Sequence, residues 1–224
     1  GIDLYGVCVL PSSDEDEVYY LGTISGVHYR FKVAPEMQQR SISTCNLLDN
    51  STVLTGAISS ITGASRLNGQ TVQVWADGRR RSDVAISGGG ASLGATYSRV
   101  VYGKSYDATF KSVKLAYAAQ LGSAVGQTKI VRNAGVVLSK STLDGLRIGK
   151  DADNTDPMPD YVDGALRTPG QFFEHYDDGA IPVQSEWDAD SRIFISADSA
   201  DGPKTIMAIV LDVETRDGAP ARNK

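Results

Sequence analysis

Basic residues are too few in this chain to indicate a general nucleic-acid binder. Of its 224 residues, 22 are Lys or Arg and 27 are Asp or Glu, so the net charge is −5 at pH 7. A protein that holds DNA tightly neutralises phosphates with a surplus of basic side chains. We therefore expect at most transient, non-specific contact with DNA.

Cysteines and long apolar runs are equally scarce. Cys8 and Cys45 are the two cysteines. They are too few for a disulfide framework, and we expect free, partly buried thiols in a reducing cytoplasm. No run of about 18 apolar residues occurs, which predicts no membrane insertion. The opening residues 1–4 resemble neither a signal peptide nor an initiation site, so we expect a fragment that begins inside a longer protein.

Few residues have the chemistry of a catalytic site. His28 falls on the polar face of a predicted strand, and we interpret it as a surface residue. Glu174, His175 and Asp177 offer acid–base or metal-binding groups, yet no Gly-x-Ser-x-Gly nucleophile motif accompanies them. Carboxylates that would suit glycoside cleavage are better explained as solvated loops in so acidic a chain: Asp177, Asp178, Asp188, Asp190, Asp198 and Asp201. We predict no enzyme and no catalytic residue.

Other ligand-binding motifs are incomplete. Residues Asp151–Asp156 place oxygen ligands at alternate positions, as a calcium loop does, but Asp156 and Val162 stand where that loop needs glycine and glutamate. No Cys or His spacing suits zinc, and the glycines within 88–90 and 122–126 lack the ending of a phosphate loop and indicate turns. The run Arg79–Arg81 is either a solvated turn tip or a contact with an acidic neighbour or a passing phosphate. We predict no cofactor and no metal.

Short segments of alternating polarity, separated by turn residues, are what the sequence does contain. Residues 27–33 alternate after a Ser25-Gly26 turn, which predicts a half-buried strand in a hairpin with residues 18–21. Residues 71–76 alternate in the same way and end at Asp77-Gly78, a strong hairpin signal. Residues 84–86 are the expected return strand.

Further strands are predicted over 53–61, 100–102, 129–131, 135–138, 172–176, 193–196 and 205–213, and residues 7–10 form a short apolar run that ends at Pro11. Residues 112–121 fit a strand or a short helix equally, and residues 150–171 read as a long loop. Residues 205–213 are apolar on both faces, which indicates a strand that is covered on both sides.

The whole pattern predicts an all-β, mainly antiparallel protein built of small β-barrel or sandwich modules, with at most one or two short helices. We divide it into an N-terminal β region (1–65), a small β module (66–106) and a C-terminal β-sandwich-like domain (107–224).

The order of several segments carries a family resemblance. Residues 66–78 read RLNGQTVQVWADG, the glycines 88–90 follow, and residues 101–106 read VYGKSY. This series is similar to the L-x-G-x-x-V-x-V-x-A-D-G stretch, Gly-rich turn and V-x-G-x-x-Y element of the tail tubular protein B, or phage stabilisation protein, family of short-tailed bacteriophages. Residues 18–33, 187–193 and 203–209 also resemble segments of that family, and the likeness covers about residues 5–215.

The resemblance implies a structural component of the virion tail, made in the bacterial cytoplasm. It implies a homo-oligomeric, hexameric ring that forms the lower tail tube or nozzle, with neighbouring tail and adaptor proteins as partners. DNA would leave through the bore as transient cargo, and acidic side chains would keep it from adhering. Residues 1–65 would end a larger, truncated β domain.

A second interpretation stays open, that of a receptor- or glycan-binding β module of a tail fibre. Tyr19, Tyr20, Tyr29, Trp75 and Trp187 could stack on sugars, although aromatic residues of β domains more often belong to the core.

Overall fold

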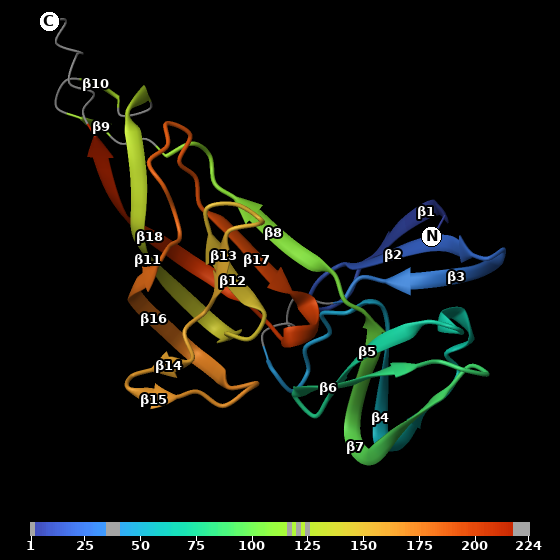
Figure 1. Ribbon diagram of the computed structural model, residues 1–224. Coiled ribbons are helices and arrows are strands. Elements are labelled where there is room, and N and C mark those ends of the chain that lie inside the picture. Colours follow the sequence, from blue (N-terminus) through green and yellow to red (C-terminus); the bar gives the residue numbers. More distant parts are fainter. Residues whose placement is uncertain (1–2, 35–40, 116–117, 120–121, 124–125, 217–224) are drawn as a thin grey trace, which may run out of the picture. The chain divides into compact units, whose positions relative to one another are not determined.

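A computed structural model of the chain describes residues 3–34, 41–115, 118–119, 122–123 and 126–216 (Figure 1). It confirms the all-β prediction, since antiparallel strands form nearly all of the regular structure. The helices among these residues are two single 3-10 turns, Ser65–Leu67 and Ser199–Asp201. The chain forms two compact units, Gly1–Tyr106 and Asp107–Lys224.

The first unit begins with a three-stranded sheet of β1 (Asp3–Leu10), β2 (Glu17–Ile24) and β3 (Val27–Lys32), in that order. The predicted turn at Ser25-Gly26 is confirmed, because both residues have positive φ angles of 51° and 78°. Such angles match the right-handed twist of a two-residue hairpin loop. No residue of these strands belongs to either of the two hydrophobic core clusters found among the described residues.

A second sheet of the first unit has the order β4-β7-β5-β6. Its strands are β4 (Asp49–Ile61), β5 (Thr71–Ala76), β6 (Arg79–Ala85) and β7 (Ala91–Lys104). The predicted hairpin at Asp77-Gly78 is confirmed, with φ of 48° and 73°. The Asp77 carboxylate also accepts the N–H groups of Ser98 and Arg99 at 3.1 and 2.9 Å, which ties the hairpin turn to β7.

The alternation of residues 71–76 positions the core of this sheet. Val72, Val74 and Ala76 point into a cluster that also holds Val100 and Tyr102 of β7. The short strand predicted at 100–102 is part of the 14-residue β7. Because β4 pairs with β7 from Asp49 to Ile61, the sheet reaches well before residue 66.

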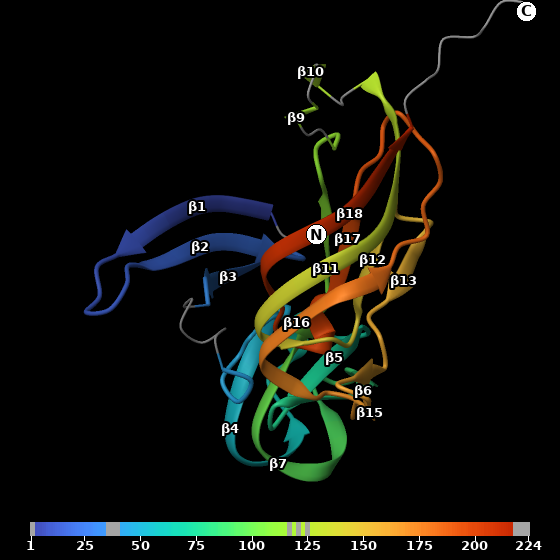
Figure 2. The same ribbon diagram turned by 90° about the vertical axis from the view of Figure 1, so that its left-hand side faces the viewer.

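The second unit is a β-sandwich. One sheet has the order β16-β11-β18 and the other has the order β13-β12-β17-β8. Figure 2 shows the first of these sheets, with β11 between β18 and β16. The strands are β8 (Asp107–Lys111), β11 (Thr128–Thr142), β12 (Leu146–Gly149), β13 (Thr155–Pro157), β16 (Phe172–Pro182), β17 (Phe194–Asp198) and β18 (Thr205–Arg216). Both sheets contribute to a single core, which includes Val136 and Leu138 of β11 and Ile148 and Ile195 of the facing sheet.

Several predictions for this unit need correction. The separate strands at 129–131 and 135–138 are one strand, β11, whose register shifts at Arg132. The loop predicted over 150–171 contains β13 and a small hairpin of β14 (Tyr161–Val162) and β15 (Ala165–Leu166). Such short strands carry too few residues for a detectable period.

Arg167 explains why this segment is ordered without an apolar pattern. Its guanidinium contacts the Asp144 carboxylate, the Asp160 carboxylate at 3.0 Å and the Pro159 carbonyl at 3.2 Å.

The segment 112–121 lies partly outside the described residues. Residues 112–115 have no regular structure, and 118–119 form the two-residue strand β9 (Ala118–Ala119), paired with β10 (Gly122–Ser123). The short helix considered for this segment is therefore absent from its described residues, and the turn expected at 122–126 includes a strand.

A further correction concerns β18, which was expected to be covered on both faces. Ile209, Leu211 and Val213 do pack on the sandwich core. On the rest of the strand, Met207 and Val210 are each 65% exposed. The prediction is wrong because β18 is an edge strand whose outer face has no covering layer within the described chain.

Candidate functional site

The β1–β3 sheet of the first unit has one apolar and one polar face. Residues opposite each other in the ladder share a face, so Val7, Tyr20 and Phe31 lie on one side, and Cys8, Tyr19 and Lys32 on the other. The same pairing puts the following residues on the apolar face: Leu4, Val7, Val9, Val18, Tyr20, Gly22, Ile24, Val27, Tyr29 and Phe31. None of these positions carries a charge.

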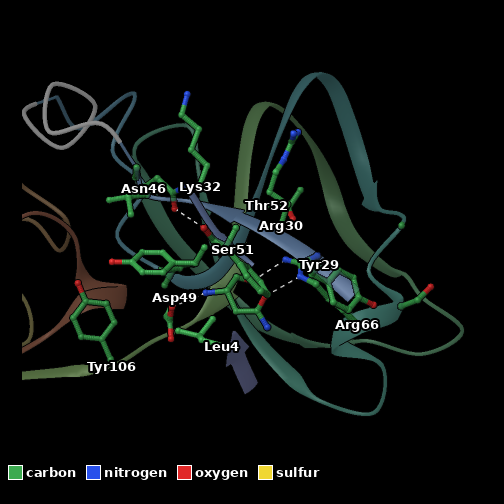
Figure 3. A pocket seen from close by; sticks show the side chains of 18 residues that line it. Leu4, Tyr29, Arg30, Lys32, Asn46, Asp49, Ser51, Thr52, Arg66 and Tyr106 are labelled. Atoms are coloured by element: carbon green, nitrogen blue, oxygen red, sulfur yellow. Dashed lines mark hydrogen bonds between the residues drawn. The ribbon is translucent and has the colours of Figure 1, made fainter. Parts of the chain in front are cut away.

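A groove of about 990 Å³ lies along part of this apolar face (Figure 3). Its aromatic lining consists of Tyr20 of β2, Tyr29 and Phe31 of β3, and Tyr106, which follows β7. Leu4 of β1 also lines it. Tyr20 is 38% exposed, and the rings of Tyr29 and Phe31 are tilted at 41° with centroids 6.2 Å apart. The groove therefore presents accessible ring surface on one side.

The rest of the lining mixes apolar residues with polar and charged ones. The charged residues are Arg30 and Lys32 of β3, Asp49 of β4 and Arg66 of the first 3-10 turn. Arg66 donates from Nε to Asn50 Oδ1 at 2.9 Å and from Nη2 to the Asn50 carbonyl at 2.7 Å. Ser51 Oγ donates to Asn46 Oδ1 at 2.9 Å. These bonds, drawn as dashed lines in Figure 3, hold the amide and guanidinium groups in fixed positions.

Local backbone features bring these polar residues together. Asn50 has a positive φ of 46°, which asparagine tolerates better than most residues, and this turns the chain at a register shift of the β4–β7 ladder. Gly103 of β7 lies against the backbone at this register shift, where a Cβ added to Gly103 would be 2.7 Å from the Asp49 carbonyl oxygen. Only glycine permits that approach. Arg66 is further oriented by the Tyr102 ring, 5.7 Å from its guanidinium carbon.

The opposite, polar face of the β1–β3 sheet holds a separate charged cluster. Glu17 accepts hydrogen bonds from Lys32 Nζ at 2.5 Å and from the Tyr19 hydroxyl at 2.6 Å. These bonds, the one from Lys32 foremost, lower the pKa of Glu17, and the bond to Glu17 raises the pKa of Tyr19. Lys32 of this cluster also lines the groove, whereas Glu17 and Tyr19 are not among its lining residues.

The five aromatic residues singled out as possible sugar-stacking groups have different environments. Tyr20 and Tyr29 share the groove. Tyr19 lies on the opposite face, with the Arg30 guanidinium 5.3 Å from its ring. Trp75 is buried and donates its indole N–H to the Ile42 carbonyl. Trp187 is in the second unit, beside Arg216.

The histidines lie apart from the groove. His28 is exposed, and its Nδ1 is 3.0 Å from the Tyr5 hydroxyl. Glu174 and His175 are exposed neighbours on β16, so their side chains point to opposite faces of the strand. Between His175 and Asp177, Tyr176 is buried in the core, where burial raises the pKa of its hydroxyl.

Most of the aspartates considered for glycoside cleavage have separate structural contacts, and Asp177 is exposed on β16. Asp188 is 3.7 Å from Lys150, Asp190 binds Arg192 at 3.1 Å, and Asp178 accepts from the Tyr176 hydroxyl. Asp198 accepts the Ala200 N–H at the start of the 3-10 turn that contains Asp201.

The motifs considered for metal or phosphate contacts form local turns. Asp151 Oδ1 accepts from the Asn154 side-chain amide and from the backbone N–H groups of Asn154 and Asp153, and these bonds, the one from the amide foremost, lower the pKa of Asp151. Over the described ranges, no group of three or more His, Cys, Asp or Glu residues is placed to hold a metal ion. Gly88 and Gly89 form a turn closed by a bridge from Ser87 to Gly90.

The three arginines after Asp77-Gly78 do not act as one basic tip. Arg79 is exposed, Arg80 is 3.7 Å from Asp83, and Arg81 stacks over the Tyr97 ring at 4.8 Å. Cys8 is exposed, whereas Cys45 is buried and its thiol donates to the Ile42 carbonyl at 3.4 Å. Within the described part of the chain, no helix has the length and apolar character needed to cross a membrane.

Sequence reasoning found the groove's tyrosines but missed its polar side. Arg66, Asn50, Asn46 and Ser51 belong to segments without a periodic pattern, and their proximity depends on the β4–β7 pairing. The chain matches no model of a known protein family, and no curated protein is similar to it in sequence.

Proposed function

We propose that this protein is a non-catalytic structural component of a bacteriophage tail, assembled from copies of itself into a ring that forms part of the tail tube or nozzle. The ordered motifs within residues 66–78, 88–90 and 101–106 support the tail assignment through their resemblance to the tail tubular protein B family. DNA is transient cargo, in keeping with a net charge of −5.

The observation that carries self-assembly is the bare outer face of β18. Residues 205–213 have the composition of a strand covered on both sides, yet Val210 is 65% exposed on the outer face. Met207, at a register shift of the ladder with β11, is also 65% exposed. Val137 of the central strand β11 lies on this outer face between Ala208 and Asp177. An apolar surface on an edge strand marks an interaction site or an aggregation hazard. A neighbouring copy would remove that hazard.

The first unit has a similar surface. Val7, Val9 and Val27 lie on the apolar face of the β1–β3 sheet and are 62%, 55% and 54% exposed. A small sheet needs its apolar face covered to be stable. Neighbouring copies, or the other tail proteins expected as partners, would cover this part of the face, whose three valines are not among the lining residues of the groove.

The proposal is tested by labelling phage particles that carry this protein with antibodies raised against residues 1–224. Electron microscopy should show label at the free end of the tail, opposite the head. Label on lateral fibres would favour a receptor-binding protein, and particles without label would show that the motif resemblance is misleading.

A further inference from the structure

We propose that the groove of the first unit binds a sugar that carries a carboxylate, with Tyr20 and Tyr29 contacting the sugar ring and Arg66 binding the carboxylate. This is a function in addition to ring assembly, and it would let the tail contact an acidic polysaccharide of a bacterial surface. It does not depend on the tail assignment.

The aromatic side of the groove suits the apolar face of a sugar ring. Tyr20 and Tyr29 project from the uncharged face of the sheet, and their hydroxyls can hydrogen-bond while their rings make apolar contact. At 38% exposed, Tyr20 is accessible although the groove partly surrounds it.

The polar side is preorganised by bonds within the protein. Asn50 engages two donors of Arg66, on Nε and Nη2, and holds the guanidinium in one orientation. A guanidinium carries five N–H donors, so donors on its outer edge are left to form the paired hydrogen bonds that a carboxylate accepts. Ser51 likewise occupies the Asn46 carbonyl oxygen, so that the Asn46 amide N–H groups are available to hydroxyls.

Size and charge narrow the ligand class further. A volume of about 990 Å³ is at the upper end of the usual range of small-molecule sites, which is enough for more than one sugar ring. None of the described lining residues is His or Cys. The charged lining residues are Arg30, Lys32 and Arg66 against the single carboxylate of Asp49, so the charge of the groove favours an anionic ligand. Its rings, amides and hydroxyls suit the rest of a sugar.

The test measures binding of short oligogalacturonates by isothermal titration calorimetry, with the methyl-esterified oligosaccharides as the matched ligand that lacks the carboxylates. A sialylated oligosaccharide serves as a second carboxylate-bearing probe. Tyr20→Ala removes a proposed contact, whereas Tyr19→Ala removes the adjacent ring on the opposite face. Arg66→Lys keeps the charge but loses the planar fork. Circular dichroism and thermal melting establish that each variant is folded.

We expect at least one carboxylate-bearing probe to bind, with affinity reduced about tenfold or more by Tyr20→Ala, by Arg66→Lys and by esterification. Tyr19→Ala should leave affinity unchanged. The inference is overturned if neither probe binds at millimolar concentration, if the esterified ligand binds equally well, or if Tyr19→Ala and Tyr20→Ala weaken binding to the same extent. Each of these outcomes leaves the labelling experiment, and hence the proposed tail function, unaffected.

Discussion

Arg66 and Asn50 are joined by two hydrogen bonds, one to the Asn50 side chain and one to its carbonyl, at a residue whose φ angle is positive. The contact links the first 3-10 turn to the start of β4. It therefore stabilises a backbone conformation that most residues avoid, and it orients the guanidinium that faces the groove.

Replacing Asn50 by alanine should destabilise the first unit. The change removes the acceptor of a charged hydrogen bond and places a Cβ-bearing residue without a polar side chain at φ 46°, which together should lower the free energy of unfolding by about 2–3 kcal/mol. Urea denaturation measures this loss in the free energy of unfolding. Asn68→Ala is the matched control, because Asn68 accepts only the longer 3.3 Å bond from Gly89 and has φ −58°. Equal losses in the two variants would contradict the role of the Arg66 contact.

Arg167→Gln should loosen the segment between residues 158 and 171. The Arg167 side chain is only 12% exposed and contacts Asp144 and Asp160, so the change leaves Asp144 without its cation and should cost about 2–3 kcal/mol. The rate of backbone amide hydrogen exchange over residues 158–171 should be higher in Arg167→Gln than in the parent chain.

Arg192→Gln removes a more exposed pair with Asp190 and should cost less than about 1 kcal/mol. If it costs as much as Arg167→Gln, the segment is not held by the Arg167 contacts.

The Glu17 cluster should make the β1–β3 sheet sensitive to acid. Because Lys32 and Tyr19 lower the folded-state pKa of Glu17 below its ordinary value of 4.5, the stabilisation is complete above 4.5 and is lost as the pH falls through the lower, folded value. NMR titration of the Glu17 carboxyl carbon measures the shift. Lys32→Met should move the titration midpoint up by more than Tyr19→Phe does, since the bond from Lys32 is the largest cause. A midpoint that neither variant moves would refute this account.

Val210→Glu should weaken self-association. The residue is 65% exposed on the outer face of β18, so a carboxylate there costs little in the isolated chain but would be desolvated in a contact between copies. Light scattering coupled to size-exclusion chromatography should show a smaller assembly than the parent chain forms. Thr205→Glu adds the same charge at an exposed, already polar position of the same strand and should leave the assembly intact. An unchanged mass for Val210→Glu would place the contact elsewhere.

The strands that sequence reasoning located best are those with a clear local period and a turn at the end. Residues 71–76 and the Asp77-Gly78 turn, and residues 27–33 with the Ser25-Gly26 turn, needed only alternation and turn chemistry, and both hairpins are present. The period also separated the two faces of β3, which put Tyr29 and His28 on opposite sides. Such features depend on neighbours within a few residues, so they can be inferred from the chain alone.

The tertiary structure decided what joins segments that are distant in the chain. Pairing of β4 with β7 brings Asn50 near the start of a turn that carries Arg66, and it requires glycine at position 103. The strand order places β18 at an edge, which leaves exposed a face that its composition marks as covered. Local patterns say how polar each face of a strand is. Only the pairing of strands that are distant in the chain determines which elements, if any, lie against each face.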